Sequence, residues 1–543
     1  MDIKALPHLP NLGQYKKQAK DLVRDRKAGD PEAIRRMQQF HPRFQSVPEA
    51  RLSAAGFSLT DAQLVIAGEH GFASWPSFAA RIEAIRREHF SLLNTNPEAA
   101  FIEAACVPLN SSHQSGNLDD AGSILLKQPE VATRSIYTAA ILGDDLTVRH
   151  LLALNPDSAT AKGGIRNWDA LTYLCFSRYL RLDPARSNGM VESARALLDA
   201  GASANTGWFE PLHQPHPMWE SAIYGAAGVA HHAELTHLLL ERGADPNDDE
   251  TPYHAAEGYD QSALKVLVES GKLNEGSLTT ILLRKADWHD FEGIKYLLAH
   301  GADPNRMTRW HHNVLHHALQ RDNEITIIDA LLDHGADPAL VNGRDGRSAT
   351  AMAAHRGRGD VIYSIERRAI PTELRGIDRL IAACAKGDTP TGDSISEQES
   401  QLVAEIIAQG GTLLAEFAGN GNVEGVRRLL DLGVDVAARY KQGDAYFDIA
   451  KDSTALHLAA WRMRHSVVKL LVARQAPVDA LDGEGRTALA LAVRACVDSY
   501  WADRRSPESV RLLLDAGASA RAVEYPSGYL EVDQLLSQYR PGV

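Results

Sequence analysis

Short leucine-rich clusters recur along most of the chain, separated by alanine-rich or polar stretches. Each cluster lies in a leucine-rich stretch that is typical of a helix packed against its neighbours. The clusters include Leu197–Leu198, Leu238–Leu240, Leu297–Leu298, Leu331–Leu332, Leu429–Leu430, Leu470–Leu471 and Leu512–Leu514. No apolar run approaches the roughly 18 residues that a membrane-spanning helix needs. The pattern predicts a series of short, packed helices and no membrane segment.

A glycine-containing block follows many of these clusters. It has the form Gly-Ala-Asp/Ser-Pro/Ala-Asn at Gly201–Asn205, Gly243–Asn247 and Gly301–Asn305, with degraded copies from Gly335, Gly433, Gln475 and Gly517. Glycine ends a helix in the left-handed conformation, and the following residues form a turn. Openings such as Thr251–Ala256 and Thr454–Ala460 start with a threonine that caps the next helix. Their spacing fits a period of about 33 residues with insertions.

This order of opening, leucine pair and closing turn resembles the ankyrin repeat. The resemblance implies an all-α fold, an ankyrin-repeat solenoid of about ten or eleven helix-turn-helix units between residues 99 and 528. It also implies that the histidines at the fourth position of the openings, His254, His316 and His457, hydrogen-bond backbone between repeats. Function would then reside on the concave groove formed by the turn tips and the inner helices.

The two ends of the chain lack the repeat. Helix starts and apolar spacing predict four short helices within residues 1–90, at 14–27, 31–40, 61–71 and 74–87. This segment resembles the helical leader ahead of some bacterial ankyrin arrays, and we expect an N-terminal helical domain that caps the first repeat. Residues 529–543 are expected to form a C-terminal capping helix, and the polar stretch 387–400 is a possible hinge.

Composition narrows the class of protein. The chain has 543 residues, too many for a single core, and a net charge of −13. That charge argues against nucleic-acid binding, which requires a basic face. The four cysteines have no metal-ligand spacing, which suits a reducing compartment. The N-terminus lacks the apolar run of a signal peptide. We therefore expect a cytoplasmic protein, a monomer without a cofactor.

Histidine and tryptophan are placed unevenly. Twelve of the 22 histidines lie between His213 and His317, and the same stretch or its edge holds Trp208, Trp219, Trp288 and Trp310. Tryptophan at loop positions either fills gaps in the stack or lines a pocket, and both interpretations remain open. Two long insertions, residues 177–186 and 498–507, add loops of the kind in which recognition usually resides. From these features we expect ligand contacts at Trp208, His213, His216, Trp219, Tyr224, Tyr253, Trp288, Arg306, Arg309, Trp310, Tyr500, Trp501 and Arg505.

Two kinds of chemistry are conceivable for this region. If the protein is an enzyme, the candidate acids, bases and proton shuttles are Glu220, His232, Asp287, His289, Asp290 and Asp503. They would suit a lyase, isomerase or hydrolase acting on a small polar or carbohydrate substrate. His213 and His216, or His311 and His312, supply possible metal donors, but no third ligand has a defined spacing, so we expect no metal site.

The leading hypothesis is a binding scaffold. An acidic repeat array favours a protein or peptide partner with basic patches, recognised through the concave groove. The central region 208–317, rich in histidine, tryptophan and arginine, is expected to make the specific contacts, with Arg306 and Arg309 gripping a carboxylate or phosphate and Trp288 and Trp310 as apolar anchors. An enzyme or small-molecule binder is the alternative.

Overall fold

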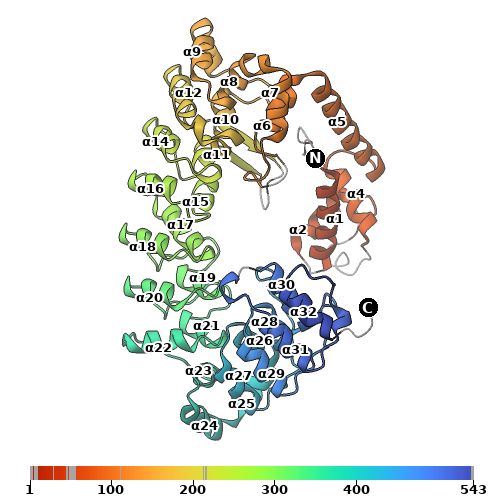
Figure 1. The fold of residues 1–543 in the computed structure, drawn as a ribbon, viewed down its shortest axis with the longest axis vertical. Helices are drawn as coiled ribbons and strands as arrows, with labels where there is room; N and C mark the ends of the chain where they lie inside the picture. The colour runs from red at the N-terminus through yellow and green to blue at the C-terminus, as the bar shows by residue number, and fades with distance from the viewer. Residues whose placement is uncertain are drawn as a thin grey trace. The chain divides into compact units, whose positions relative to one another are not determined.

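The computed structural model describes residues 4, 6, 10–27, 30–44, 47, 57–109, 112–211, 213, 217–499 and 501–539. The chain divides into two compact units, Met1–Ser277 (unit 1) and Leu278–Val543 (unit 2). Helices dominate both units, and the described strands pair as two short antiparallel ribbons (Figure 1). The predicted all-α repeat class is therefore confirmed.

The elements have the following bounds. Unit 1 contains α1 (Leu12–Lys27), α2 (Pro31–Phe40), α4 (Leu59–Glu69), α5 (Trp75–Thr95), α6 (Pro97–Ala105), α7 (Asp119–Lys127), η1 (Pro129–Thr133), α8 (Ile136–Leu142), α9 (Asp145–Leu154), η2 (Pro156–Ala159), α10 (Ala170–Cys175), α11 (Arg178–Leu182), η3 (Pro184–Arg186), α12 (Ser187–Asp199), β1 (Gly207–Glu210), β2 (Met218–Ser221), α13 (Ala222–Tyr224), η4 (Gly225–Val229), α14 (Ala233–Glu241), α15 (Glu250–His254) and α16 (Ser262–Glu269). The remaining elements, of which only α17 starts before residue 278, are α17 (Glu275–Asp287), α18 (Phe291–Ala299), α19 (Val314–Gln320), α20 (Ile325–Asp333), α21 (Ala349–His355), α22 (Gly359–Arg367), α23 (Ile377–Lys386), α24 (Thr389–Gln398), α25 (Ser400–Ala408), α26 (Gly410–Gly419), α27 (Val423–Asp431), β3 (Arg439–Tyr440), β4 (Ser453–Thr454), α28 (Ala455–Trp461), α29 (His465–Ala473), α30 (Ala488–Val497), η5 (Ala502–Arg504), α31 (Glu508–Asp515), η6 (Ala520–Ala522) and α32 (Leu530–Gln538).

The N-terminal helices α1, α2, α4 and α5 lie where the four predicted helices do, within a few residues at most ends, although α5 extends to Thr95. Their starts follow from local chemistry, because the Asp30 side chain accepts the Ala33 N–H and Ser58 and Asp61 form a capping box. A small core of its own holds these helices together, with Tyr15 and Phe78 fully buried in it. The predicted C-terminal helix is present as α32.

The closing turns explain the repeated block. Gly201 and Gly301 have φ angles of 100° and 87°, and even the degraded block keeps the turn, with Gln475 at 61°. The block asparagines join successive turns. Asn205 Nδ2 donates to Gly243 O at 2.9 Å, and Asn305 Nδ2 donates to Gly335 O at 2.8 Å. In these two repeats one asparagine thus satisfies a backbone carbonyl of the next turn.

The opening histidines do not all behave as the resemblance implies. His457 does, because its Nε2 lies 3.1 Å from Arg486 O in the next repeat. His254 instead lies between two carboxylates, with Nε2 3.0 Å from Glu250 and Nδ1 3.1 Å from Glu257. The expected backbone role is therefore replaced at His254 by an ionic one.

Unit 2 contains a sharp change of direction that the repeat pattern does not predict. Asn422 Nδ2, after α26, donates to Gly357 O and Ala385 O, both at 2.7 Å. Arg462 after α28 also hydrogen-bonds the carboxylate of Asp322 after α19, across 140 positions in sequence. In a straight stack, turns that are so far apart in sequence would be separated in space by several repeats. The polar stretch expected as a hinge, 387–400, contains α24 in this region, and its bending stays a prediction.

Among the described residues no single helix is long and apolar enough to cross a membrane. The bent pair α25 and α26 meets that test only by length and composition when taken together. Leu413, Leu414 and Phe417 of α26 are buried within the repeat packing.

Candidate functional site

The β1–β2 ribbon of unit 1 separates two chemically different faces. Trp208 pairs with Glu220, and Phe209 pairs with Trp219 in the adjacent register position. Because side chains alternate along a strand, the first pair points inward and the second outward. Trp208 and Glu220 are 7% and 0% exposed, whereas Phe209 and Trp219 are 57% and 43% exposed.

Aromatic side chains fill the space beneath the inner face. The Trp208 ring lies 5.0 Å from that of Trp168 and packs against Phe176. His113, which precedes α7, places Nδ1 2.9 Å from the hydroxyl of Tyr224. Trp208 and Tyr224, two of the expected ligand contacts, are thus buried in the core of unit 1.

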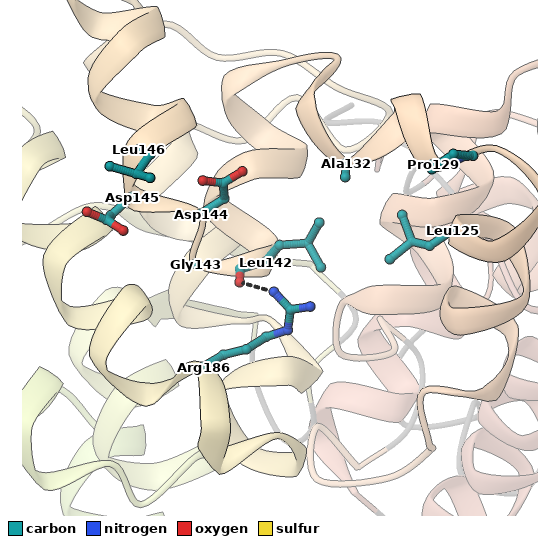
Figure 2. Close-up of a pocket in the computed structure, with 9 residues that line it drawn as sticks. All are labelled: Leu125, Pro129, Ala132, Leu142, Gly143, Asp144, Asp145, Leu146 and Arg186. Carbon is teal, nitrogen blue, oxygen red and sulfur yellow. Dashed lines mark hydrogen bonds between the residues drawn. The ribbon is translucent and has the colours of Figure 1, made fainter.

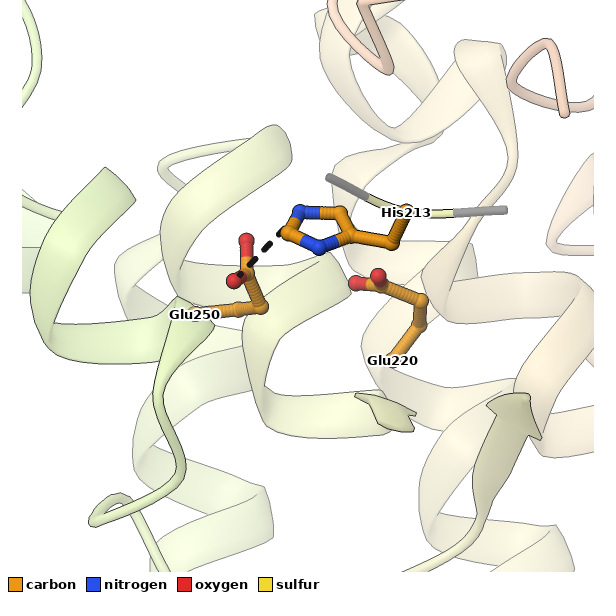
Figure 3. A group of neighbouring side chains, drawn as sticks. All are labelled: His213, Glu220 and Glu250. Carbon is orange, nitrogen blue, oxygen red and sulfur yellow. Dashed lines mark ion pairs between the residues drawn. The ribbon is translucent and has the colours of Figure 1, made fainter. Parts of the chain in front are cut away.

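Glu220 is a buried carboxyl group without a hydrogen-bond partner. Neither of its oxygens bonds any group within the described part of the chain. Burial, and then repulsion from Glu250 and Glu210, raises its pKa to about 9. In Figure 3 its carboxyl group points toward the ring of His213, opposite Glu250. One donor atom from each of these three residues lies within 4.8 Å of the other two.

Glu250 begins α15 and is oriented by the next helical turn. His254 Nε2 lies 3.0 Å from Glu250 Oε2, and His213 Nε2 lies 3.7 Å from Glu250 Oε1. Burial alone would lower the pKa of His254, but hydrogen bonds to Glu250 and Glu257 outweigh it and raise the pKa to about 9. Burial likewise opposes ionisation of Glu250, yet His254 holds the pKa of Glu250 below its usual value. The result is an ordered ion pair beside the unpaired Glu220.

Unit 2 brings together a second group around Asp287, at the end of α17. Its carboxylate accepts from Arg284, from Arg321 Nε at 2.5 Å, and lies 2.8 Å from His317 Nε2. Burial opposes ionisation, but His317 and the arginines dominate and lower the pKa of Asp287. The guanidinium of Arg321 also stacks over the ring of Tyr446, 3.7 Å from its centroid. These contacts hold Asp287 ionised.

His312 extends this group by one residue. Its Nε2 lies 2.9 Å from His317 Nδ1, and its Nδ1 lies 2.9 Å from the carbonyl oxygen of Trp310. Both ring nitrogens are therefore engaged by the protein itself. Burial, and then the neighbouring His317, lowers the pKa of His312 to about 4. The side chains of His312, His317 and Asp287 are thus linked in series by hydrogen bonds, and this network has a structural role.

Burial of His312 against His317 makes the free energy of unfolding depend on pH. In the folded protein His312 resists protonation down to about pH 4, whereas an unfolded histidine titrates near about 6.5. The stability contribution is present above about pH 6.5 and is lost as the pH falls toward 4, because the unfolded chain binds the proton first. Denaturant unfolding at several pH values in this range measures the effect. The free energy of unfolding should fall less steeply with decreasing pH for His312→Gln than for the unchanged protein. His237→Gln, which replaces an exposed histidine, serves as the control. If the stability of all three proteins depends equally on pH, His312 is not the group responsible.

Two of the expected acid/base residues, Asp290 and His232, serve as helix caps. The Asp290 side chain accepts the Gly293 N–H at 2.9 Å and pairs with the buried Lys285 at 2.8 Å. His232 Nδ1 accepts the Leu235 N–H, and its Nε2 lies 2.7 Å from Ser187 Oγ. Burial lowers the pKa of His232. Both side chains are tied to local structure.

The other expected residues are dispersed. Exposed positions hold Trp288, His289, Arg306, Arg309, Asp503 and Arg505, and Tyr253 and Trp310 are half-buried. The guanidinium of Arg309 lies over the Trp310 ring at 4.8 Å. Trp501 is buried against Phe447 and Trp461, so it fills a gap. His216 and Tyr500 lie outside the described residues.

A hollow of about 400 Å³ lies elsewhere in unit 1, between η1 and the α8–α9 turn. Figure 2 shows its lining, in which Arg186 of the first insertion donates to Leu142 O at 2.9 Å. None of the expected ligand contacts that the structure describes lines this hollow. The first insertion therefore contributes one wall of a surface hollow that the sequence did not indicate.

The inner site contains residues that sequence reasoning missed. Glu250 stands immediately before an ordinary repeat opening, and His113 lies in an unremarkable polar loop. Only their convergence with Glu220 and His213 gives them significance. In unit 2 the same holds for Arg284, His317, Arg321 and Tyr446. The one available signal was the density of histidine around residue 213.

Comparisons with known proteins agree with the repeat architecture. Residues 282–365 and 414–523 match the family model of ankyrin repeats (3 copies). Serine/threonine-protein kinase 12 of Arabidopsis thaliana is 40% identical over 84 residues, which are 16% of this chain and 16% of that protein. The human ASB11 ankyrin repeat domain aligns with 48% of this chain and 98% of its own, at 19% identity and a TM-score of 0.24.

The chain contains ankyrin repeats. The family match lies in residues 282–365 and 414–523. In unit 1 the blocks at Gly201 and Gly243 follow α12 and α14, just as the blocks at Gly301 and Gly335 follow α18 and α20 within the matched residues. Ankyrin repeats generally mediate protein–protein interaction, which supports a scaffold role.

Proposed function

We propose that this protein is a binding scaffold for a protein or peptide partner, and that the outer face of the β1–β2 ribbon is a contact surface. The exposed cross-strand pair Phe209 and Trp219 carries this proposal. Large aromatic side chains gain free energy when a partner removes them from water, and they dominate many interfaces. Two such rings, adjacent on a rigid ribbon, form a preorganised anchor.

The charge of the molecule supports a basic partner. The chain carries a net charge of −13, and such an excess speeds encounter with a surface of opposite sign. A partner segment that combines apolar and basic side chains would match this surface. In unit 2 the exposed residues Arg306 and Met307, with the Arg309–Trp310 pair, form a second candidate contact surface, which would receive a carboxylate or phosphate group of the partner and not its basic side chains.

Affinity capture with the full chain tests the proposal. We expect the unchanged protein to retain a specific partner. The variant Phe209→Ser/Trp219→Ser should bind that partner more weakly by about tenfold or more, as is found when central anchor residues of an interface are removed. The matched control is Leu126→Ser/Leu154→Ser, which removes two apolar side chains of unit 1 that are 87% and 70% exposed. Capture that is unaffected by the ribbon variant, or equally reduced by the control, would contradict the assigned surface.

The enzyme alternative has weaker support. A general acid or base must change its protonation state near the working pH. Asp287 is held ionised by His317 and two arginines, and Asp290 pairs with Lys285. The scaffold proposal requires neither residue to titrate.

A further inference from the structure

The inner face of the β1–β2 ribbon contains a buried carboxyl group that nothing in the described protein satisfies. Glu220 is 0% exposed and both of its oxygens lack a hydrogen-bond partner. A buried polar group without a partner destabilises the folded state, and does so more strongly when it is charged. A buried group of this kind needs an explanation, and one explanation is an ion that binds beside it.

The surroundings of Glu220 favour a cation. The largest electrostatic effects on Glu220 include those of three carboxylates, Glu250, Glu210 and Asp248, and the opposing effect of His254. His254 is itself held between Glu250 and Glu257 at 3.0 and 3.1 Å. A positive charge beside Glu220 would therefore relieve repulsion among several carboxylates at once.

The donor set identifies the class of cation. We propose that His213, Glu220 and Glu250 bind a divalent transition-metal ion, with zinc as the best match. One imidazole and two carboxylates suit zinc and its neighbours, whereas magnesium and calcium prefer oxygen ligands alone. Three protein ligands also correspond to zinc sites in which a further position is left for water or another ligand.

The geometry is close to that of a coordination shell. The three donor atoms lie within 4.8 Å of one another. Small rotations of these side chains would bring them to the roughly 3.4 Å separation of ligands around a tetrahedral zinc with bonds of roughly 2.1 Å. Figure 3 shows the two carboxyl groups on either side of the His213 ring.

The residues around Glu250 provide the support that metal ligands usually have. His254 Nε2 bonds Oε2 of Glu250 and leaves Oε1 on the side of His213, 3.7 Å from its Nε2. Glu257 in turn orients His254. Such outer contacts fix the direction of a ligand and are typical of metal centres in proteins.

Zinc titration of the purified full chain, stripped with a chelator and dialysed, tests the proposal. We expect one equivalent of zinc to bind and to raise the thermal unfolding temperature, and cobalt to bind at the same site with visible absorption bands. Glu220→Gln and His213→Ala should each weaken binding by about tenfold or more. His237→Ala, which removes an exposed histidine 3.2 Å from Glu241, should bind as the unchanged protein does.

Two results would overturn the proposal. One is binding of less than about a tenth of an equivalent by the unchanged chain at a zinc concentration that saturates ordinary sites. The other is zinc affinity that Glu220→Gln leaves unchanged. Glu220→Gln keeps the shape of the side chain and breaks no hydrogen bond, and its circular dichroism verifies the fold. The scaffold proposal is tested separately, because Phe209 and Trp219 lie on the opposite face of the ribbon.

Discussion

Replacing Asp322 by alanine is expected to lower the free energy of unfolding by about 3–5 kcal/mol, the cost of leaving buried charges uncompensated. Asp322 accepts hydrogen bonds from Arg462 and, at 2.9 Å, from Arg464, and lies 3.6 Å from Arg358. Arg462 is only 1% exposed. Removing the carboxylate leaves several buried guanidinium groups with less compensating charge, at the point where distant turns of unit 2 meet.

Denaturant unfolding of the full chain measures this effect. Asp322→Asn keeps the size of the side chain. It should lose most of the same stability, because it also removes the negative charge that compensates the guanidinium groups. The control is Glu373→Ala, whose ion pair with Arg375 is 71% and 80% exposed; because water screens such a pair, this variant should leave the stability nearly unchanged. A loss for Asp322→Ala as small as that of the control would show that the turns do not depend on this carboxylate.

Asp290→Asn is expected to destabilise the protein by about 3 kcal/mol, because a buried ammonium loses its carboxylate. Lys285 is fully buried, and its Nζ lies 2.8 Å from Asp290 Oδ2. The asparagine oxygen can still accept the Gly293 N–H, so the helix cap is preserved and the charge alone is removed.

The double variant Lys285→Met/Asp290→Asn separates charge from packing. Replacing a buried ion pair by neutral groups of similar volume is often close to neutral, so we expect the double variant to regain most of the lost stability, to within about 1 kcal/mol. Calorimetry or denaturant unfolding of the four proteins in the cycle gives the coupling. If Asp290→Asn unfolds like the unchanged protein, Asp290 is free for the acid/base role that the sequence suggested.

The repeat fold could be predicted because its determinants are local and periodic. A leucine pair, a threonine or serine cap and a closing glycine each act within a few residues, and each recurs in order. The same logic located the N-terminal helices α1, α2, α4 and α5. Even the closing turn at Gln475, which lacks glycine, was identified from its neighbours and keeps a φ of 61°.

The candidate site could be predicted only in part. Glu220, His213 and the ribbon aromatics stand out because the repeat does not require them. Their roles depend on which face of β1 and β2 each side chain occupies, and the register of the ribbon decides that. A shift of one residue would expose Glu220 and bury Trp219. Trp208 and Trp219, equivalent as sequence features, consequently have opposite environments.

The sequence by itself determined the class of fold, the position of most helices and the region in which unusual side chains gather, since each of these follows from short-range patterns. Tertiary structure alone decided which residues meet. Glu250 comes beside Glu220 because one repeat packs on the next, and Arg462 reaches Asp322 across 140 positions because unit 2 changes direction. Contacts of this kind depend on the packing of whole helices, and no local pattern in the chain encodes them.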